Sequence, residues 1–398
     1  FCLANGVAPL VFETFPADVD VVVDALLGTG ISEIVRDDYR SVIDTINASG
    51  LPVLSVDLPS GLCGDTGRVL GACVRADVTV TFIGQKLGLY TNNGPEYCGE
   101  IILETLGIPA TVLEQCEPVA QKMNFAALRT LMPKRHRNAH KVRHGHLLVV
   151  GGDATMGGAV SMAAEAALFS GAGMVSVATA PQNVAPVIIR RPEIMARGIN
   201  SETDLEPMLR RATAVVMGPG LGRGPWSQMV FNCVLETGLP LVIDADALNM
   251  LAERDAAGAT RDNCVLTPHP GEASRLLFGV DIRAVDIQAD RLASIRALHR
   301  RFGGVVLLKG SGTLIQDPAG DVSLCPYGNP GMSVAGMGDI LSGVIGGLIV
   351  QGMGVSDAVR LGVSVHSLAA DCLVLQHGEL GLLATELLPE IRRLLNSK

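Results

Sequence analysis

Short apolar runs that end in glycine or aspartate recur along this chain of 398 residues, and stretches with a helical pattern separate most of them. A short apolar run bounded by turn residues is typical of a strand buried on both faces of a parallel sheet. Strands of this kind that alternate with helices indicate the α/β class, in which ligands bind beyond the carboxyl ends of the strands. The loops at those strand ends are therefore the expected location of a functional site.

The first block of strands, residues 1–115, carries polar side chains where two of its strands end. Asp24 stands before the glycine-containing loop 28–36, and Asp57 and Ser60 follow the next strand. Because the carboxyl ends of parallel strands meet at one edge of the sheet, we expect these side chains to lie close together. The expected strands lie within residues 18–30, 51–61, 76–84 and 99–108, and the expected helix is Tyr39–Ser49.

Residues 116–137 are expected to link the two blocks, and the overlapping segment 134–146 holds four of the eight histidines of the chain among lysines and arginines. Three interpretations of this segment stay open: a metal site, a solvated basic linker, and an entrance for an acidic ligand. The linker is favoured, because no carboxylate or cysteine stands nearby to complete a metal site.

The second block, residues 138–398, is expected to form one large α/β layer domain. An alanine-rich helix is expected over residues 157–173, and two further helical patterns cover 340–350 and 356–375 near the end of the chain. The expected strands lie within residues 145–153, 174–180, 213–220, 239–246, 263–272 and 304–315.

Composition excludes several classes of function. The net charge of −9, with aromatic residues at only 4%, argues against nucleic-acid binding. We find no apolar run of the roughly 18 residues that a membrane span needs, so no membrane association is expected. The nine cysteines contain no C-x-x-C pair, which argues against a zinc ribbon and predicts reduced thiols in a cytoplasmic protein.

The segment 329–343, NPGMSVAGMGDILSG, places glycines and an acid directly before an apolar helix. Gly336 and Gly338 allow a bent backbone whose N–H groups can hold an anion at the helix start. Asp339 would repel that anion, so its position is explained if it accepts a proton while the N–H groups hold a phosphate. A helix-capping role for Asp339 is the alternative.

Four further loops of the second block carry residues suited to a ligand. Each alone has a structural interpretation: a tight turn, a hairpin, a structural His269, and a helix cap by Asp246. Their position on successive strand ends, together with Asp339, favours a shared site, and the absence of a Walker A sequence argues against a P-loop. The loops are GPGLGRG (218–224), DADALN (244–249), TPHPGE (267–272) and KGSGT (309–313).

The second block resembles the ribokinase-like superfamily, whose anion hole and catalytic aspartate lie in a G-x-G-D motif, matched here by GMGD at 336–339. Together with HLLVVGGD at 146–153, the loops above make residues 138–398 similar to the nucleotide-dependent NAD(P)H-hydrate dehydratases. The first block, with DALLGTG and VDLPSG, resembles the NAD(P)H-hydrate epimerase domain. The resemblance implies a truncated N-terminal Rossmann-like parallel sheet and a C-terminal ribokinase-like three-layer α/β/α domain.

The resemblance implies an enzyme that repairs hydrated nicotinamide cofactors. Its dehydratase domain would use ADP or ATP, with Mg²⁺, to phosphorylate the 6-hydroxyl of (6S)-NADHX or (6S)-NADPHX. Loss of the phosphate then restores NAD(P)H, and with ADP the other product is AMP. Its epimerase domain, with K⁺, would interconvert the R and S hydrates. Small molecules are the expected partners, and a homo-oligomer is expected.

For the dehydratase, the resemblance implies a role for each loop. Asp339 would be the catalytic base, and the hydrate pocket would be completed by the glycine loop and His269. The nucleotide would be held by Lys309, Gly310, Ser311, Gly312 and Thr313, the anion hole would be Gly336, Met337 and Gly338, and the hydrate would contact Ala159, Gly220, Gly222, His269 and Asp339.

For the epimerase, the resemblance makes Asp24 and Ser60 ligands of K⁺ and Asp57 a contact of the hydrate. The family's domain begins with a further segment containing Asn-Asn-x-x-Asp, which this chain lacks, so epimerase activity is not expected of the chain as it stands. The loop implied to hold the dinucleotide phosphates is Gly28, Thr29, Gly30, Ile31, Ser32, Glu33 and Ile34.

Two other functions share some of these residues. A ribokinase-like small-molecule kinase, such as a thiamin-precursor kinase, would also carry GMGD, but it would release a stable phosphorylated alcohol and would not need the first block. A non-catalytic nucleotide-binding regulator is disfavoured, because the negative charge of Asp339 would repel the nucleotide phosphates and weaken binding.

Overall fold

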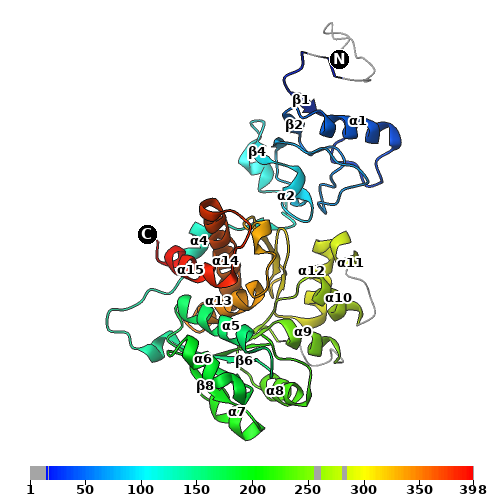
Figure 1. The fold of residues 1–398 in the computed structure, drawn as a ribbon. Helices are drawn as coiled ribbons and strands as arrows, with labels where there is room; N and C mark the ends of the chain where they lie inside the picture. The colour runs from blue at the N-terminus through cyan, green and yellow to red at the C-terminus, as the bar shows by residue number, and fades with distance from the viewer. Residues whose placement is uncertain (1–14, 17, 255–260, 280–284, 398) are drawn as a thin grey trace. The chain divides into compact units, whose positions relative to one another are not determined.

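The computed structural model describes residues 15–16, 18–254, 261–279 and 285–397. The chain divides into two compact units, Phe1–Val119 and Ala120–Lys398, each of which is considered by itself (Figure 1). Both units combine a largely parallel sheet with helices, which confirms the α/β class.

The described residues of the first unit form a four-stranded parallel sheet in the order β1-β2-β3-β4. Helix α1 (Asp37–Ala48) connects the first two strands and buries Ile43 and Ile46 against Val22 and Val53. All four predicted strands are present, each as part of the predicted range. They are β1 (Val22–Asp24), β2 (Val53–Val56), β3 (Val78–Phe82) and β4 (Glu100–Glu104), with short helices η2 (Leu87–Leu89), α2 (Gly94–Tyr97) and α3 (Ala110–Leu113).

In the described part of the second unit, ten strands form one sheet in the order β5-β14-β13-β12-β11-β10-β9-β6-β7-β8. The strands from β12 to β8 are parallel, whereas β13 is antiparallel to both β12 and β14. The strands are β5 (Gln121–Lys122), β6 (His146–Val150), β7 (Met174–Thr179), β8 (Met195–Gly198), β9 (Ala214–Met217), β10 (Leu241–Ile243), β11 (Cys264–Leu266), β12 (Val305–Leu308), β13 (Leu314–Gln316) and β14 (Val322–Leu324).

One predicted strand is wrong in extent. The range 304–315 contains β12, the loop 309–313 and the start of the antiparallel strand β13. Gly310, with φ of 138°, and Gly312, with φ of 63°, reverse the chain there, which glycine does without the steric cost of a side chain. The hairpin that the sequence analysis gave as the structural interpretation of KGSGT is therefore present.

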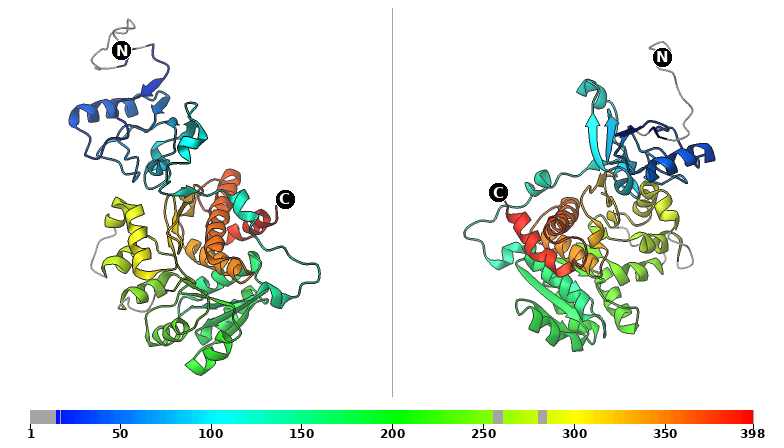
Figure 2. Two further views of the ribbon diagram at one scale, coloured as in Figure 1. Left: turned by 180° about the vertical axis from the view of Figure 1, so that it is seen from behind. Right: turned by 45° about the horizontal axis from the view of Figure 1, so that its top comes forward.

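Helices cover both faces of the large sheet, which confirms the predicted three-layer arrangement (Figures 1 and 2). One strand and one helix, β5 and α4, lie within the range 116–137 that was assigned to a linker from the sequence. One face carries α4 (Phe125–Arg129), α5 (Gly157–Phe169), α6 (Val184–Arg190), α13 (Met337–Ile349), α14 (Val355–His377) and α15 (Leu387–Asn396). The other carries α7 (Glu202–Leu209), α8 (Pro225–Leu235), α9 (Ala245–Ala252), α10 (Pro270–Phe278), α11 (Val285–Ala289) and α12 (Arg291–Phe302).

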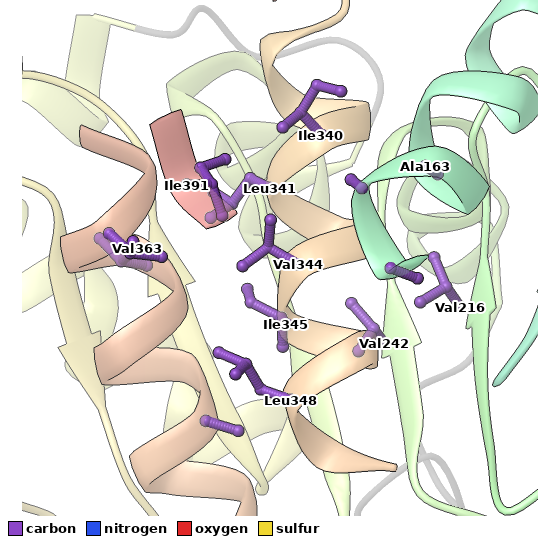
Figure 3. Close-up of a cluster of buried hydrophobic side chains, with 14 of the residues drawn as sticks. Ala163, Val216, Val242, Ile340, Leu341, Val344, Ile345, Leu348, Val363 and Ile391 are labelled. Atoms are coloured by element: carbon purple, nitrogen blue, oxygen red, sulfur yellow. The ribbon is translucent and has the colours of Figure 1, made fainter. Parts of the chain in front are cut away.

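Helix α13 lies at the centre of the core of the second unit. Figure 3 shows its side chains Ile340, Val344 and Leu348 among residues of the sheet and of the neighbouring helices. A Cβ atom at Gly343 would lie 2.1 Å from the carbonyl oxygen of Ala163 in α5, which is closer than real contacts allow. The glycine therefore lets the two helix backbones touch, and this contact fixes where α13 begins.

Helix α14 is the one described helix that is long and apolar enough to cross a membrane, with 23 residues and a mean hydropathy of 1.5 over its most apolar window. It packs against α13, α15 and α4, and 61% of that window is buried inside the protein. Its apolar composition is therefore accounted for by its place in the core.

Replacing Gly343 by alanine tests the contact between α13 and α5. We expect Gly343→Ala to lower the free energy of unfolding by about 1–3 kcal/mol, because the added methyl meets backbone that cannot rotate away. Gly158→Ala is the matched control, because Gly158 is also helical and has open space at its Cβ position. Chemical denaturation of both variants checks this, and equal stability of the two would contradict the close contact.

Candidate active site

The GMGD segment forms the start of α13. Gly336 is its N-cap residue, with a left-handed φ of 92°, and a Cβ atom there would lie 2.7 Å from the side chain of Met162. Met337 and Gly338 follow as the first residues of the helix, and Asp339 lies within its first turn. Since the N-cap is Gly336, Asp339 is not the capping residue, and the capping alternative for Asp339 is not supported. The first N–H groups of this helix are available to an anion in the manner typical of helix N-termini.

The pKa of Asp339 is raised to about 7. Burial is the main cause, repulsion from Asp244 and Asp246 adds to it, and attraction to Lys309 opposes it. A carboxylate whose pKa lies near neutrality can both accept and release a proton under physiological conditions.

Lys309 extends from the end of β12 toward this turn. Its Nζ lies 3.1 Å from Asp244 Oδ1, 3.7 Å from Glu272 Oε2, and 3.4 Å from the position that a Cβ atom on Gly338 would take. Burial lowers the pKa of Lys309, but the charges of Asp244, Glu272 and Asp339 outweigh burial and raise it. Lys309 therefore carries a positive charge at neutral pH, and it lies beside Asp339.

The two acids of the DADALN loop have separate roles. Asp244, at the end of β10, is buried and accepts a hydrogen bond from Thr267 Oγ1 at 2.7 Å as well as from Lys309. Asp246 accepts a hydrogen bond from the Gly222 backbone N–H at 2.8 Å, so its interpretation as a helix cap is wrong. Ala245 between them has φ of 48°, and such strain in a residue other than glycine is concentrated at functional sites.

The glycine loop 218–224 brings three of the predicted hydrate-pocket residues together. A Cβ atom at Gly220 would lie 3.2 Å from Cβ of Ala159 in α5, and one at Gly222 would lie 2.6 Å from Asp153 Oδ2. Both glycines have positive φ, 57° for Gly220 and 71° for Gly222. The loop thus follows the start of α5 closely and leaves no room for side chains at these positions.

His269 caps the start of α10. Its Nδ1 accepts hydrogen bonds from the backbone N–H groups of Gly271 (3.0 Å) and Glu272 (3.3 Å), while the Glu272 carboxylate accepts one from the His269 N–H. Burial, with repulsion from Lys309 and Arg275, lowers the pKa of His269 to about 4. The ring is therefore neutral at pH 7, and its remaining ring nitrogen, Nε2, carries the proton. The structural role of His269 is confirmed, because its side chain caps helix α10. A contact between Nε2 and the substrate stays a prediction.

Two buried residues near the site were missed by the sequence reasoning. His366 of α14 bonds the backbone of Met337, and burial lowers its pKa to about 4, so it supports the GMGD turn as a neutral ring. Arg291 of α12 bonds the backbone of the loop 309–313. Helical periodicity could have found Arg291, because it shares the buried face of α12 with Ile295, Leu298 and Phe302.

The histidine-rich segment 134–146 does not join this site. The ring of His146, at the amino end of β6, is paired with Ser176 Oγ at 2.7 Å and with the Arg211 carbonyl oxygen at 3.2 Å. Within the described residues there is no group of three or more His, Cys, Asp or Glu side chains placed to hold a metal ion. The metal interpretation of this segment is therefore not supported.

In the first unit, the predicted K⁺ ligands Asp24 and Ser60 are neighbours. Asp24 Oδ1 accepts a hydrogen bond from Ser60 Oγ at 2.6 Å, and Oδ2 accepts from the Ser60 N–H at 2.8 Å and from Ser55 Oγ at 2.9 Å. The Leu27 carbonyl oxygen lies 3.3 Å from Ser60 Oγ. This cluster of oxygens is the type of donor set that hard cations select.

Asp57 lies at the end of β2 in a strained conformation, with φ of 68°. Its Oδ1 accepts hydrogen bonds from Thr81 Oγ1 and the Phe82 N–H, each at 3.1 Å, and from Lys86 Nζ. Burial alone would raise the pKa of Asp57, but Lys86 and the Phe82 N–H outweigh burial and lower it. Lys86, which the sequence reasoning missed, thus holds Asp57 ionised.

The predicted phosphate loop Gly28–Ile34 borders a cavity of about 320 Å³. Residues of this loop and of the start of α1 line it, among them Gly30, Ser32, Arg36 and Tyr39. The cavity is large enough for part of a dinucleotide, and it opens beside the amino end of a helix.

Comparisons with known proteins agree with this geometry. The model of the NAD(P)H-hydrate dehydratase family matches residues 147–393, and that of the YjeF-related protein N-terminus matches residues 4–88. A ribokinase-like superfamily protein from Enterococcus faecalis superposes with a TM-score of 0.62 at 26% identity, over 70% of this chain and 96% of that protein. The ADP/ATP-dependent NAD(P)H-hydrate dehydratase from Bacillus subtilis, co-crystallised with ATP and Mg²⁺, gives a TM-score of 0.61 at 27% identity, over 69% and 97%. The second unit is thus a ribokinase-like domain of the NAD(P)H-hydrate dehydratase family.

Relatives of known sequence extend the likeness to both units. The chain is 49% identical to the bifunctional NAD(P)H-hydrate repair enzyme Nnr of Coxiella burnetii, over 95% of this chain and 76% of the relative. It is 40% identical to Nnr of Escherichia coli, over 96% and 73%. The chain belongs to the family of bifunctional NAD(P)H-hydrate repair enzymes.

The raised pKa of Asp339 predicts a pH-dependent effect of Asp339→Asn on stability. The folded pKa of about 7 lies above the value of 3.8 for an ordinary aspartate, so ionised Asp339 destabilises the folded state. The resulting loss of stability grows as the pH rises and is complete only above pH 7. We expect the thermal midpoint of Asp339→Asn to exceed that of the unmodified protein by more at pH 8 than at pH 5. Calorimetry at both pH values checks this, and a constant difference would place the pKa of Asp339 in its ordinary range.

Proposed function

We propose that the second unit catalyses the nucleotide-dependent dehydration of (6S)-NADHX and (6S)-NADPHX to NADH and NADPH. The observation that carries the proposal is a carboxylate with a pKa near neutrality, Asp339, in the first turn of a helix whose N–H groups can hold a phosphate. Family membership supplies the substrate class, and the residues below supply the chemistry.

Asp339 is proposed to accept the proton of the 6-hydroxyl as the hydroxyl oxygen attacks the terminal phosphorus of ADP or ATP. The oxygen–phosphorus bond forms, the bond to the leaving nucleotide breaks, and AMP leaves when ADP is used. The carbon–oxygen bond at C6 then breaks, phosphate leaves, and loss of a proton from C5 restores the ring double bond. The N–H groups at Gly336–Gly338 are placed to stabilise the charge on the transferred phosphoryl group.

Lys309 has a different role from the remainder of the KGSGT loop in this proposal. Its ammonium lies beside Gly338 and attracts the charge of Asp339, so it keeps the base from being permanently protonated and adds positive charge near the phosphate. The backbone of Gly310–Thr313 is left to hold the adenylate part of the nucleotide. The hydrate pocket is proposed to be lined by Ala159, Gly220, Gly222 and His269.

Mg²⁺ fits this site only as a partner of the nucleotide. The described residues provide no cage of three or more acidic or histidine ligands, and Mg²⁺ commonly binds through substrate phosphates with one or two carboxylates. Asp244 and Asp246 are the carboxylates that would bind Mg²⁺ together with these phosphates. Bound Mg²⁺ would neutralise charge on the phosphates.

Contrary to the expectation stated from the sequence, we propose that the first unit interconverts the R and S hydrates, because the chain belongs to a family of bifunctional enzymes. Asp57, held ionised by Lys86, would contact the nicotinamide hydrate, and the loop Gly28–Ile34 would hold the dinucleotide phosphates. Asp24 and Ser60 would hold K⁺ through their oxygen atoms. The ion would then link the end of β1 to the segment that follows β2. A homo-oligomer and a cytoplasmic location stay predictions.

Asp339→Asn tests the proposed base. The amide keeps the shape but cannot accept a proton, so turnover of S-hydrate with ADP should fall at least about 100-fold, which corresponds to about 2.7 kcal/mol of barrier. Affinity for ADP should stay level or increase, because a negative charge near the phosphates is removed. The return of the near-ultraviolet absorbance of reduced nicotinamide measures turnover, and calorimetry measures ADP binding.

Asp357→Asn is the control for this variant. Asp357 lies in the first turn of α14, in the same position that Asp339 occupies in α13, and it should keep normal turnover. If Asp339→Asn is as active as this control, the proposed mechanism is wrong. A product that retains the phosphate would instead identify a kinase.

Lys309→Met is expected to shift the pH dependence of the reaction. Lys309 lowers the pKa of Asp339, so its removal raises that pKa and moves the acidic limb of kcat/KM to higher pH. The control is Lys141→Met, at an exposed position in the short helix η3 (Lys141–His144). An acidic limb that stays in place in Lys309→Met, as in the control, would show that Lys309 does not act on the base.

A further inference from the structure

Arg291, the first residue of α12, is among the largest fully buried side chains of the described residues, with 1% of its surface exposed. Burial lowers its pKa to about 10, which leaves the guanidinium charged at neutral pH. Burying a charged group is costly unless its N–H groups are hydrogen-bonded. The groups that it contacts therefore indicate why it is there.

The guanidinium contacts the backbone of the loop 309–313. Its Nη2 donates to the carbonyl oxygens of Leu308 at 3.1 Å, Lys309 at 3.3 Å and Gly312 at 3.5 Å. Its Nη1 donates to Gln288 Oε1 at 2.9 Å. One side chain thus holds carbonyl groups from both ends of the loop.

Gly310 makes this contact possible. A Cβ atom on Gly310 would lie 2.9 Å from Nη1 and 3.2 Å from Nη2 of Arg291, and the φ of Gly310 is 138°. Any side chain at this position would push the guanidinium away from the loop. The first glycine of KGSGT is therefore matched to Arg291.

The direction of the carbonyl groups has a consequence for the opposite side of the loop. In a trans peptide the C=O and N–H groups point in opposite directions. Since the carbonyl groups of Lys309 and Gly312 face Arg291, the N–H groups of Gly310 and Thr313 face away from it. Backbone N–H groups that face outward from one loop can together bind an anion.

We propose that Arg291 is a positioning residue for the nucleotide: it holds the loop carbonyl groups on the inner side, so that the loop N–H groups are presented to a nucleoside diphosphate or triphosphate on the outer side. The proposal rests on the proposed role of the loop 309–313 in nucleotide binding, and it adds a residue that does not itself touch the nucleotide. It separates nucleotide binding from hydrate binding, because the hydrate pocket is built from other loops.

Two variants and a control test this role in the full chain. Arg291→Lys keeps a cation but loses the planar guanidinium, whose two terminal nitrogens donate from fixed positions to Gln288 and to the loop carbonyl groups. Gln288→Ala removes the acceptor of Nη1 at an exposed position, where folding is not at risk. The control is Arg296→Met, on the exposed side of the same helix. Calorimetry gives the Kd for ADP, and steady-state assays give the KM for nucleotide and for hydrate separately.

We expect Arg291→Lys to weaken ADP binding about tenfold or more, as the loss of one or two hydrogen bonds implies, with the KM for hydrate unchanged. Gln288→Ala should weaken it to a smaller degree, and Arg296→Met should not change it. An ADP Kd within twofold of the unmodified protein in Arg291→Lys overturns the proposal, as does an equal rise in both KM values. If Arg291→Lys does not fold, Gln288→Ala decides: an unchanged ADP Kd overturns the proposal, and a selective loss of ADP binding supports it.

The same titration separates this proposal from the proposed function. If the unmodified protein binds ADP but does not convert S-hydrate, the dehydratase function fails, whereas the role of Arg291 is still judged by ADP binding of the variants. If the unmodified protein binds neither ADP nor ATP, the nucleotide role of the loop and the proposal for Arg291 both fail.

Discussion

The ammonium of Lys309 lies among three carboxylates, Asp244, Glu272 and Asp339, and the active site of the second unit depends on this balance of charge. Three buried acids around one cation cannot all be ionised at low cost. Burial raises the pKa of both Asp339 and Glu272, whereas Lys309 lowers both. The balance of burial and charge thus places the pKa of one acid, Asp339, near neutrality.

A second feature is that two cations, Lys86 and Arg291, donate their hydrogen bonds to groups of the protein itself. Lys86 donates to Asp57, to Thr81 Oγ1 at 3.0 Å and to the Phe82 carbonyl oxygen at 3.0 Å. An ammonium has three hydrogens, and these contacts use all of them. Arg291 is similarly occupied by loop carbonyl groups. The fixed positive charge therefore supports residues proposed to contact the dinucleotide in the first unit and residues proposed to contact ADP or ATP in the second.

The amino-acid sequence predicted the α/β class, the four strands of the first unit and the loops that gather at the site, because strand hydrophobicity and glycine position are local signals. It placed GMGD at a helix start and Ala159 near Gly220, both of which the structure shows. It did not predict the hydrogen bond from Gly222 to Asp246, because this bond depends on how two separate loops meet. The roles of Arg291 and Lys86 were also missed, since charged residues in helices and loops usually lie at the surface and their burial here is decided by tertiary packing.

The glycine contact between α13 and α5 has a consequence for how this family can vary. At Gly343 the neighbour of the absent side chain is the backbone of Ala163, with its carbonyl oxygen 2.1 Å from the Cβ position. Paired changes at two positions arise when one side chain can compensate for another. A peptide group is the same whatever residue bears it, so no change at position 163 can make room for a larger residue at 343. This contact should leave no trace of covariation between the two helices, although it fixes the position of the helix that carries Asp339, the proposed catalytic base.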